Sequence, residues 1–237
     1  MSFAIIAHRG ASADAPDNSS EAFNLAISQH ADLIETDVRV TADDVLVLEH
    51  DASIPKENGE KLEVRYSTLA QLQAAKPHLL TVAAAVREFG AKIPFCWETK
   101  AAGLEHRLIY LLRDLLPETM WQRSEFTSFS LASVFDFVRL REQLGETFSV
   151  GWLTRQWDDD AIALARDNEF TQLCPPARRV LENPELVARA VEQGLQVRVW
   201  LVETPEMAAE LFPLDVYGGT VNFPGAVAAH RDSAVNI

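Results

Sequence analysis

Short apolar runs alternate with longer amphipathic segments along most of the chain. The apolar runs predict strands at nine places, namely residues 3–8, 32–38, 45–50, 93–99, 126–129, 148–153, 170–174, 196–202 and 216–221. Segments such as 104–116 and 131–145 lie between these runs and repeat apolar residues at helical spacing, which predicts helices with one buried face. Alternation of strand and helix over this length is typical of a parallel sheet.

The spacing of the predicted strands favours a TIM (β/α)8 barrel. A short turn joins runs 32–38 and 45–50, so the nine strands fit a barrel with one extra strand and a short insertion after the second strand. An open doubly wound sheet is the alternative, but no G-x-G-x-x-G motif follows the first strand. No low-complexity linker interrupts the chain, and 237 residues with 48% hydrophobic content can bury one large core. We therefore expect a single barrel domain over residues 1–237.

The charge balance limits the classes of partner. The chain has 35 acidic and 21 basic residues and a net charge of −14, so we expect neither nucleic-acid binding nor stable membrane association. The sequence shows no signal-peptide pattern and no apolar stretch of membrane-spanning length, which favours a cytoplasmic location. Cys96 and Cys174 lie in apolar surroundings without a C-x-x-C spacing and are expected to be reduced thiols. The oligomeric state stays open.

Ionisable residues stand at the ends of the first strands, where a TIM barrel carries its chemistry. The pairs at four consecutive predicted strands are His8 and Arg9, Glu35 and Asp37, His50 and Asp51, and Glu98 and Lys100. A histidine and an arginine have no place in a strand that is buried on both faces, so we expect these pairs at the rim of the barrel.

Three of these residues predict a site for a hard cation. Glu35 and Asp37 are two apart on one strand and point the same way, and Glu98 ends another strand. Their oxygen atoms suit Mg²⁺ or Ca²⁺ and not zinc. Any one of these carboxylates alone is better interpreted as a solvated loop residue or a salt-bridge partner, but three of them beside two histidines favour the metal site.

The remaining residues predict acid–base chemistry on an anion. His8 and His50 end apolar strands in the same half of the predicted barrel, which favours a general acid–base pair. Arg9 and Lys100 supply positive charge that could hold a phosphate. A helix predicted after the first strand, with Asn18 as its N-cap, would add its amino end to this anion site.

Several stretches resemble the glycerophosphodiester phosphodiesterase family. They are "IAHRGASADAPDNSSEAF", "ADLIETDVRVTADDVLVLEHD" and "WETK", and more weakly "VRVWLVE" and "VNFPG". The resemblance implies a TIM barrel that uses a divalent cation to hydrolyse small phosphodiester substrates to glycerol 3-phosphate and an alcohol. It also implies a role for each candidate: His8 and His50 as acid and base, Glu35, Asp37 and Glu98 as metal ligands, Arg9 and Lys100 as phosphate contacts, and Trp200 as a wall of the glycerol pocket.

The chain departs from the family pattern around the pocket. Leu201 and Glu203 stand where the family tends to have a threonine and a polar amide, and Asn222 replaces the usual aspartate. The alcohol, the choice between Mg²⁺ and Ca²⁺ and the assignment of acid and base to the two histidines stay open. Two alternatives also remain: a related barrel phosphodiesterase acting on a lysophospholipid or a phosphoinositide, and a non-catalytic binder of phosphate ligands.

Overall fold

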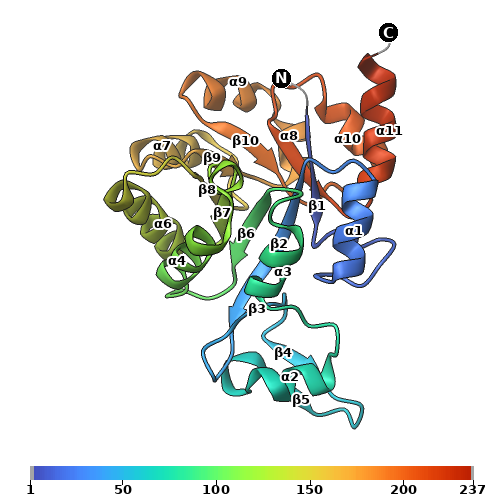
Figure 1. Ribbon diagram of the computed structural model, residues 1–237. Coiled ribbons are helices and arrows are strands. Elements are labelled where there is room, and N and C mark those ends of the chain that lie inside the picture. Colours follow the sequence, from blue (N-terminus) through green and yellow to red (C-terminus); the bar gives the residue numbers. More distant parts are fainter. Residues whose placement is uncertain (1–2, 236–237) are drawn as a thin grey trace.

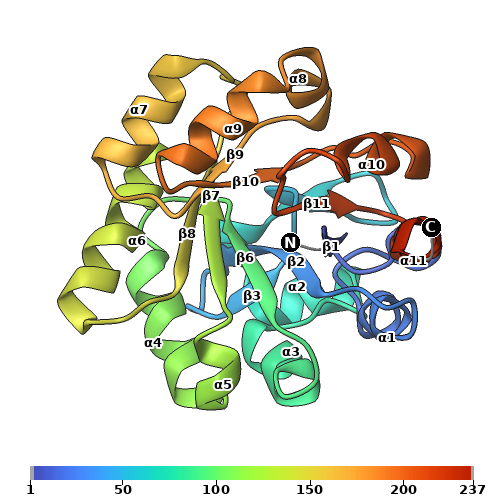
Figure 2. The same cartoon turned by 90° about the horizontal axis from the view of Figure 1, so that it is seen from above.

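Eight parallel strands form a closed barrel in the computed structural model, which describes residues 3–235 (Figures 1 and 2). β1 pairs with both β2 and β11, and this double pairing closes the ring. The barrel strands are β1 (Ala4–His8), β2 (Leu33–Val40), β6 (Phe95–Thr99), β7 (Glu125–Ser128), β8 (Ser149–Leu153), β9 (Gln172–Cys174), β10 (Gln196–Val199) and β11 (Gly218–Val221). The predicted TIM barrel is confirmed, as are all nine predicted strand positions.

Helices surround the barrel and cover its outer face (Figure 2). The longer ones are α1 (Ser20–Ser28), α3 (Val82–Phe89), α4 (Glu105–Leu115), α6 (Leu131–Leu144), α7 (Asp159–Asp167), α9 (Glu185–Glu192), α10 (Pro205–Leu211) and α11 (Pro224–Val235), and the short ones are α5 (Glu118–Trp121) and α8 (Ala177–Glu182). Their apolar faces pack on the strands. Phe23 of α1, for example, meets Phe89 of α3 and Phe95 of β6 edge-on, with ring centroids 5.4 and 5.6 Å away. Such contacts fix the strands that carry the site.

The insertion after β2 lies at the carboxyl end of the barrel, at the bottom of Figure 1. It contains β3 (Leu46–Leu48), the hairpin of β4 (Ser53–Pro55) and β5 (Lys61–Glu63), a 3₁₀ turn over Val64–Tyr66 and α2 (Leu69–Ala75). β3 is the extra strand that the sequence predicts, and it runs antiparallel to the end of β2. A small apolar cluster separate from the main core stabilises the insertion; its buried members are Val47, Ile54, Val64, Leu72 and Leu79.

The start of α1 differs from the prediction. Ser19, and not Asn18, is the N-cap, because the Ser19 hydroxyl accepts a hydrogen bond from the Ala22 amide at 3.1 Å. Asn18 has a left-handed backbone (φ 54°), and its buried side chain donates to Asp37 Oδ2 at 3.0 Å. This long-range bond draws Asn18 into the barrel mouth, so the prediction that Asn18 caps the helix is wrong.

Two further expectations concern the thiols and the membrane. Cys96 and Cys174 are both buried and unpaired with each other, in agreement with the prediction of free thiols. None of the helices within residues 3–235 combines the length and the hydropathy that a membrane span requires.

Candidate active site

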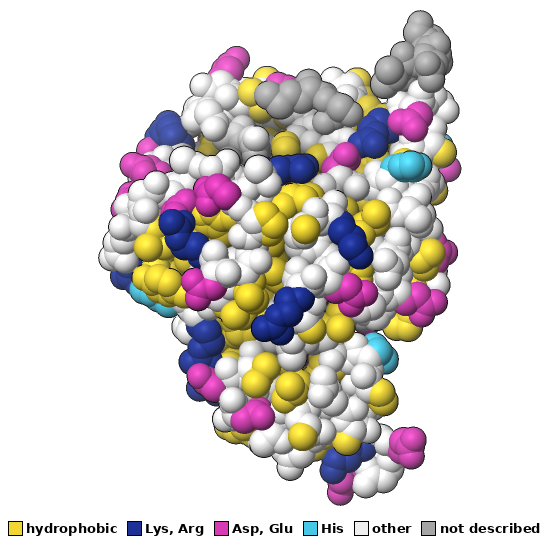
Figure 3. Space-filling model, in the orientation of Figure 1, with side chains coloured by type: hydrophobic (Ala, Val, Ile, Leu, Met, Phe, Trp, Pro, Cys, Tyr) yellow, Lys and Arg dark blue, Asp and Glu magenta, His cyan; other side chains and the backbone are white. Residues whose placement is uncertain are grey.

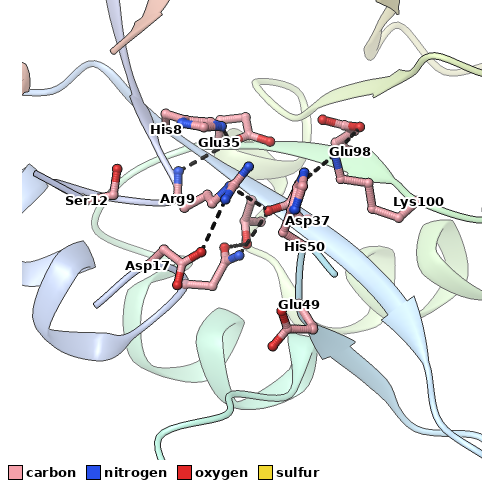
Figure 4. Close-up of polar contacts among 12 residues, drawn as sticks. His8, Arg9, Ser12, Asp17, Glu35, Asp37, Glu49, His50, Glu98 and Lys100 are labelled. Carbon is pink, nitrogen blue, oxygen red and sulfur yellow. Dashed lines mark hydrogen bonds and ion pairs between the residues drawn. The ribbon is translucent and has the colours of Figure 1, made fainter. Parts of the chain in front are cut away.

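The three predicted metal-ligating carboxylates converge at the carboxyl ends of β2 and β6 (Figure 4). In the parallel register of these strands Asp37 lies opposite Glu98, while Glu35 precedes Asp37 by two residues and therefore points to the same face. One oxygen atom from each of Glu35, Asp37 and Glu98 lies within 4.8 Å of the others, and all three residues are buried. The strand register thus builds a compact cluster of oxygen atoms.

Two cationic side chains flank Asp37 on opposite sides. Lys100 Nζ lies 3.0 Å from Asp37 Oδ1 and 2.6 Å from Glu98 Oε1, and Arg9 Nε lies 3.0 Å from Asp37 Oδ2. Arg9 also contacts Asp17 at 3.3 Å. Burial raises the pKa of Asp37, but the charges of Lys100 and Arg9 together with hydrogen bonds to the carboxylate outweigh burial, so the pKa is lowered and this carboxylate stays ionised.

Glu35 and Glu98 have the opposite electrostatic balance. Burial and repulsion from Asp37 raise the pKa of Glu35, and burial and repulsion from Glu35 raise the pKa of Glu98 to about 7. Glu35 Oε1 is buried and accepts no hydrogen bond within residues 3–235. A hard divalent cation fits this donor set, because it would offset the repulsion and would coordinate the unpartnered oxygen.

His8 ends β1 and faces the carboxylates. Its Nδ1 lies 2.7 Å from Asn222 Oδ1, and its Nε2 lies 3.9 Å from Glu35 Oε2. Burial, followed by the charge of Arg9, lowers the pKa of His8. The ring is therefore predominantly neutral at physiological pH.

His50 reaches the same site from the insertion after β2. The sequence predicts that His50 ends an apolar strand, and His50 follows β3, the extra strand, which is antiparallel to β2 and outside the barrel ring. Because β3 runs back toward the mouth, the Glu49 amide donates to the Asp37 carbonyl at 3.0 Å. Arg39 Nη2 then holds the His50 carbonyl at 2.7 Å, and His50 Nδ1 lies 2.8 Å from Asp51 Oδ1. The structure therefore brings His8 and His50 into the lining of one pocket.

One pocket of about 300 Å³ brings the predicted residues together. Its lining includes seven of the eight candidates, namely His8, Arg9, Glu35, His50, Glu98, Lys100 and Trp200. The eighth, Asp37, is almost fully buried between Arg9 and Lys100. Trp200 donates from Nε1 to the Cys174 carbonyl at 2.9 Å, which fixes its ring at the wall.

Sequence reasoning missed other parts of the pocket wall. Phe129 directly follows β7 and Arg155 stands two residues after the end of β8, so the rule that located the other candidates could have found them. The Phe129 ring meets Trp200 edge-on at 5.3 Å, and the Arg155 guanidinium lies 5.9 Å from the Phe129 ring centroid. Leu201, which the sequence marks as a departure from the family pattern, also lines the pocket; the residue is 58% exposed and its backbone is left-handed (φ 57°).

The pocket gathers four cationic side chains. On the face shown in Figure 3, basic and acidic side chains are interspersed. In the pocket, Arg9, Lys100, Arg155 and Arg198 all contribute to the lining, even though the whole chain carries a net charge of −14. These cations lie beside Glu35, Asp37 and Glu98, so they would bind an anion in this acidic protein together with a divalent cation that offsets the carboxylates.

A (β/α)8 barrel with carboxylates, histidines and cations at the carboxyl ends of its strands defines a TIM-barrel enzyme. The chain belongs to the glycerophosphoryl diester phosphodiesterase family, whose model matches residues 8–226. The protein YhdW of Bacillus subtilis is 27% identical over 241 residues, which cover 93% of this chain and 94% of YhdW. A glycerophosphodiester phosphodiesterase of Caldanaerobacter subterraneus is 25% identical over 238 residues, which cover 92% of this chain and 93% of that protein.

Solved structures share the fold. A glycerophosphodiester phosphodiesterase from Agrobacterium tumefaciens superposes with a TM-score of 0.80 at 20% identity, covering 96% of this chain and 99% of that one. A phosphodiesterase from Oleispira antarctica, solved in complex with its product sn-glycerol-3-phosphate, superposes with a TM-score of 0.82 at 19% identity, covering 98% and 97% of the two chains.

Proposed function

We propose that this protein hydrolyses glycerophosphodiesters to glycerol 3-phosphate and an alcohol, with a divalent cation, Mg²⁺ or Ca²⁺, held by Glu35, Asp37 and Glu98. One observation carries the proposal: two carboxylates, two histidines and two cations line one pocket of a barrel that belongs to this family, and a third carboxylate, Asp37, is buried between the two cations. The substrate and product named for the family's relatives suit a pocket with these charges.

Each residue then has a chemical task. When bound, the divalent cation would stabilise negative charge on the phosphoryl oxygens. Arg9 and Lys100 donate hydrogen bonds to the same phosphate group and are already held in place by Asp37. Trp200 lines the part of the pocket that takes the glycerol.

The two histidines move the protons. One imidazole accepts the proton of the attacking hydroxyl while the new phosphorus–oxygen bond forms. The other donates a proton to the leaving alkoxide oxygen while the old phosphorus–oxygen bond breaks. When the attacking hydroxyl is the glycerol 2-hydroxyl, the product of this step is a cyclic phosphate, and water then opens it to give glycerol 3-phosphate. His8 and His50 are supplied by different segments, β1 and the insertion, and both line the pocket, so each can act on a different oxygen of one phosphate.

The experiment is release of glycerol 3-phosphate from glycerophosphocholine by the full chain. Mg²⁺ and Ca²⁺ are each added separately after treatment with EDTA. We expect release with at least one cation and loss of release in EDTA and in Glu98→Gln. The exposed Glu57→Gln is the matched control and should keep wild-type activity.

The outcomes separate the alternatives. Undiminished turnover in EDTA would refute the cation site. Cation-dependent binding of glycerol 3-phosphate without any turnover of the diester would instead indicate a non-catalytic phosphate binder.

A further inference from the structure

Asn222 lies beside His8 because their strands are neighbours in the barrel. β1 and β11 are parallel, and Ala7 of β1 lies opposite Val221 of β11. The next residue on each strand end is therefore His8 and Asn222, and His8 Nδ1 lies 2.7 Å from Asn222 Oδ1. The bond joins residues 214 positions apart in the sequence.

Asn222 is itself held by the loop that follows β1. The Ser12 hydroxyl donates to the same Asn222 Oδ1 at 3.1 Å, and the Ala13 amide donates to the Asn222 main-chain carbonyl at 3.0 Å. Both side-chain contacts converge on the amide oxygen. Asn222 is thus attached to the loop through its backbone and through its side chain.

An amide oxygen accepts hydrogen bonds and cannot donate one. His8 Nδ1 must therefore carry the hydrogen of this bond, and a neutral imidazole with a proton on Nδ1 has its lone pair on Nε2. Nε2 is the nitrogen on the side of the carboxylates, 3.9 Å from Glu35 Oε2. In this tautomer Nε2 can accept a proton from a hydroxyl group in the pocket.

We propose that Asn222 is a positioning residue that holds His8 in the Nδ1–H tautomer with the Nε2 lone pair directed into the pocket. The inference rests on the proposed function only for the role of His8 in turnover. When a substrate hydroxyl loses its proton to Nε2, the ring becomes an imidazolium and the Nδ1–H bond to Asn222 persists. His50 is held differently, because its Nδ1 partner is the carboxylate of Asp51 and not a neutral amide.

Two kinds of measurement test the proposal on the full chain. The ¹⁵N NMR signals of the His8 ring, assigned by their loss in His8→Gln, report which nitrogen carries the proton at about pH 8, above the ordinary histidine pKa. We expect a proton on Nδ1 in the wild type and in Asn222→Asp, which keeps an acceptor. In Asn222→Leu, which has no acceptor, the Nε2–H tautomer should appear, and Asn222→Ala is a second variant of this type.

Kinetics with glycerophosphocholine give the second readout. Asn222→Leu should lower kcat by about fivefold, the effect of losing one hydrogen bond, with little change in KM, and Asn222→Asp should restore kcat. The control is Asn24→Leu, which replaces an exposed asparagine on α1 and should leave both constants unchanged.

The outcomes separate this inference from the proposed function. A wild-type His8 with its proton on Nε2, or unchanged ring signals in both Asn222→Leu and Asn222→Ala, would overturn the positioning role. If the wild type releases no glycerol 3-phosphate but its His8 carries the Nδ1 proton and responds to both variants, the positioning role stands and the proposed function falls.

Discussion

Glu98→Gln should make the cation-free protein more stable at alkaline pH, and it should abolish the activity measured with added cation. Burial and Glu35 raise the pKa of Glu98 to about 7, from an ordinary value of 4.5. At pH values between 4.5 and about 7, the folded state binds more protons than the unfolded state. The contribution of Glu98 to the free energy of unfolding therefore falls as the pH rises through this range, and it is constant at higher pH. The shift corresponds to about 3 kcal/mol of destabilisation at pH 8, and glutamine removes this penalty because it carries no charge.

The assay is thermal unfolding of wild type and Glu98→Gln in EDTA at several pH values between about 5 and 8. For a domain of this size, about 3 kcal/mol corresponds to a rise in the unfolding midpoint of roughly 6–12 °C for the variant at pH 8, with little difference at pH 5. The carboxamide oxygen of the variant can still accept from Lys100, so the hydrogen bond that Lys100 donates to Glu98 at 2.6 Å need not be lost.

Added Mg²⁺ or Ca²⁺ should stabilise the wild type at pH 8 much more than Glu98→Gln, because the variant lacks one proposed ligand. Glu57→Gln removes an exposed charge in the insertion and should match the wild type in every condition. A Glu98→Gln protein less stable than the wild type in EDTA at pH 8 would refute the electrostatic reasoning.

Three further predictions test the other side chains with glycerophosphocholine as substrate. His8→Ala and His50→Ala should each lower kcat by roughly 10²-fold without unfolding the protein, and near-normal turnover would remove the acid–base role from that histidine. Lys100→Met should lower kcat/KM by about tenfold or more, because a charged hydrogen bond to phosphate is lost. The control Arg139→Met removes an exposed charge on α6 and should change kcat/KM little. Equal losses of kcat/KM in the two variants would indicate that the overall electrostatic field, and not a local contact, holds the substrate. Arg155 lines the pocket and has no carboxylate within ion-pair distance among residues 3–235, so its charge is available to the substrate. Arg155→Met should therefore raise KM about threefold with kcat unchanged. A fall in kcat alone would contradict this binding role.

The barrel could be predicted because its strands are buried on both faces and so appear in the sequence as continuous apolar runs. Ile5, Ile6 and Ala7 of β1 show no exposed surface. The hairpin of β4 and β5 was not predicted, because each strand has three residues and β5 is largely exposed. A periodic pattern cannot develop over so few positions.

Side chains placed by strand geometry were predictable, and those placed by neighbouring segments were not. The spacing of Glu35 and Asp37 by two residues determines that they share a face, whatever the rest of the fold. The bond between His8 and Asn222 depends on the register of β1 against β11. The predicted barrel implies that its first and last strands pair, but it does not specify which residues lie opposite each other. His50 reaches the pocket because β3 reverses direction after β2, and an apolar run alone does not show strand direction.

Asp37 links the proposed cation site to the proposed phosphate contacts. Arg9 and Lys100 are each held 3.0 Å from one of its oxygens, so both cations are in position before a substrate binds. When ionised, the three clustered carboxylates outnumber these two cations by one charge, and the centre of the site would repel an anionic diester. A divalent cation would reverse that sign and leave one net positive charge, which a phosphodiester carrying one negative charge would neutralise. The charge balance therefore favours cation binding before substrate binding, and the KM for the diester should fall as the cation concentration rises toward saturation.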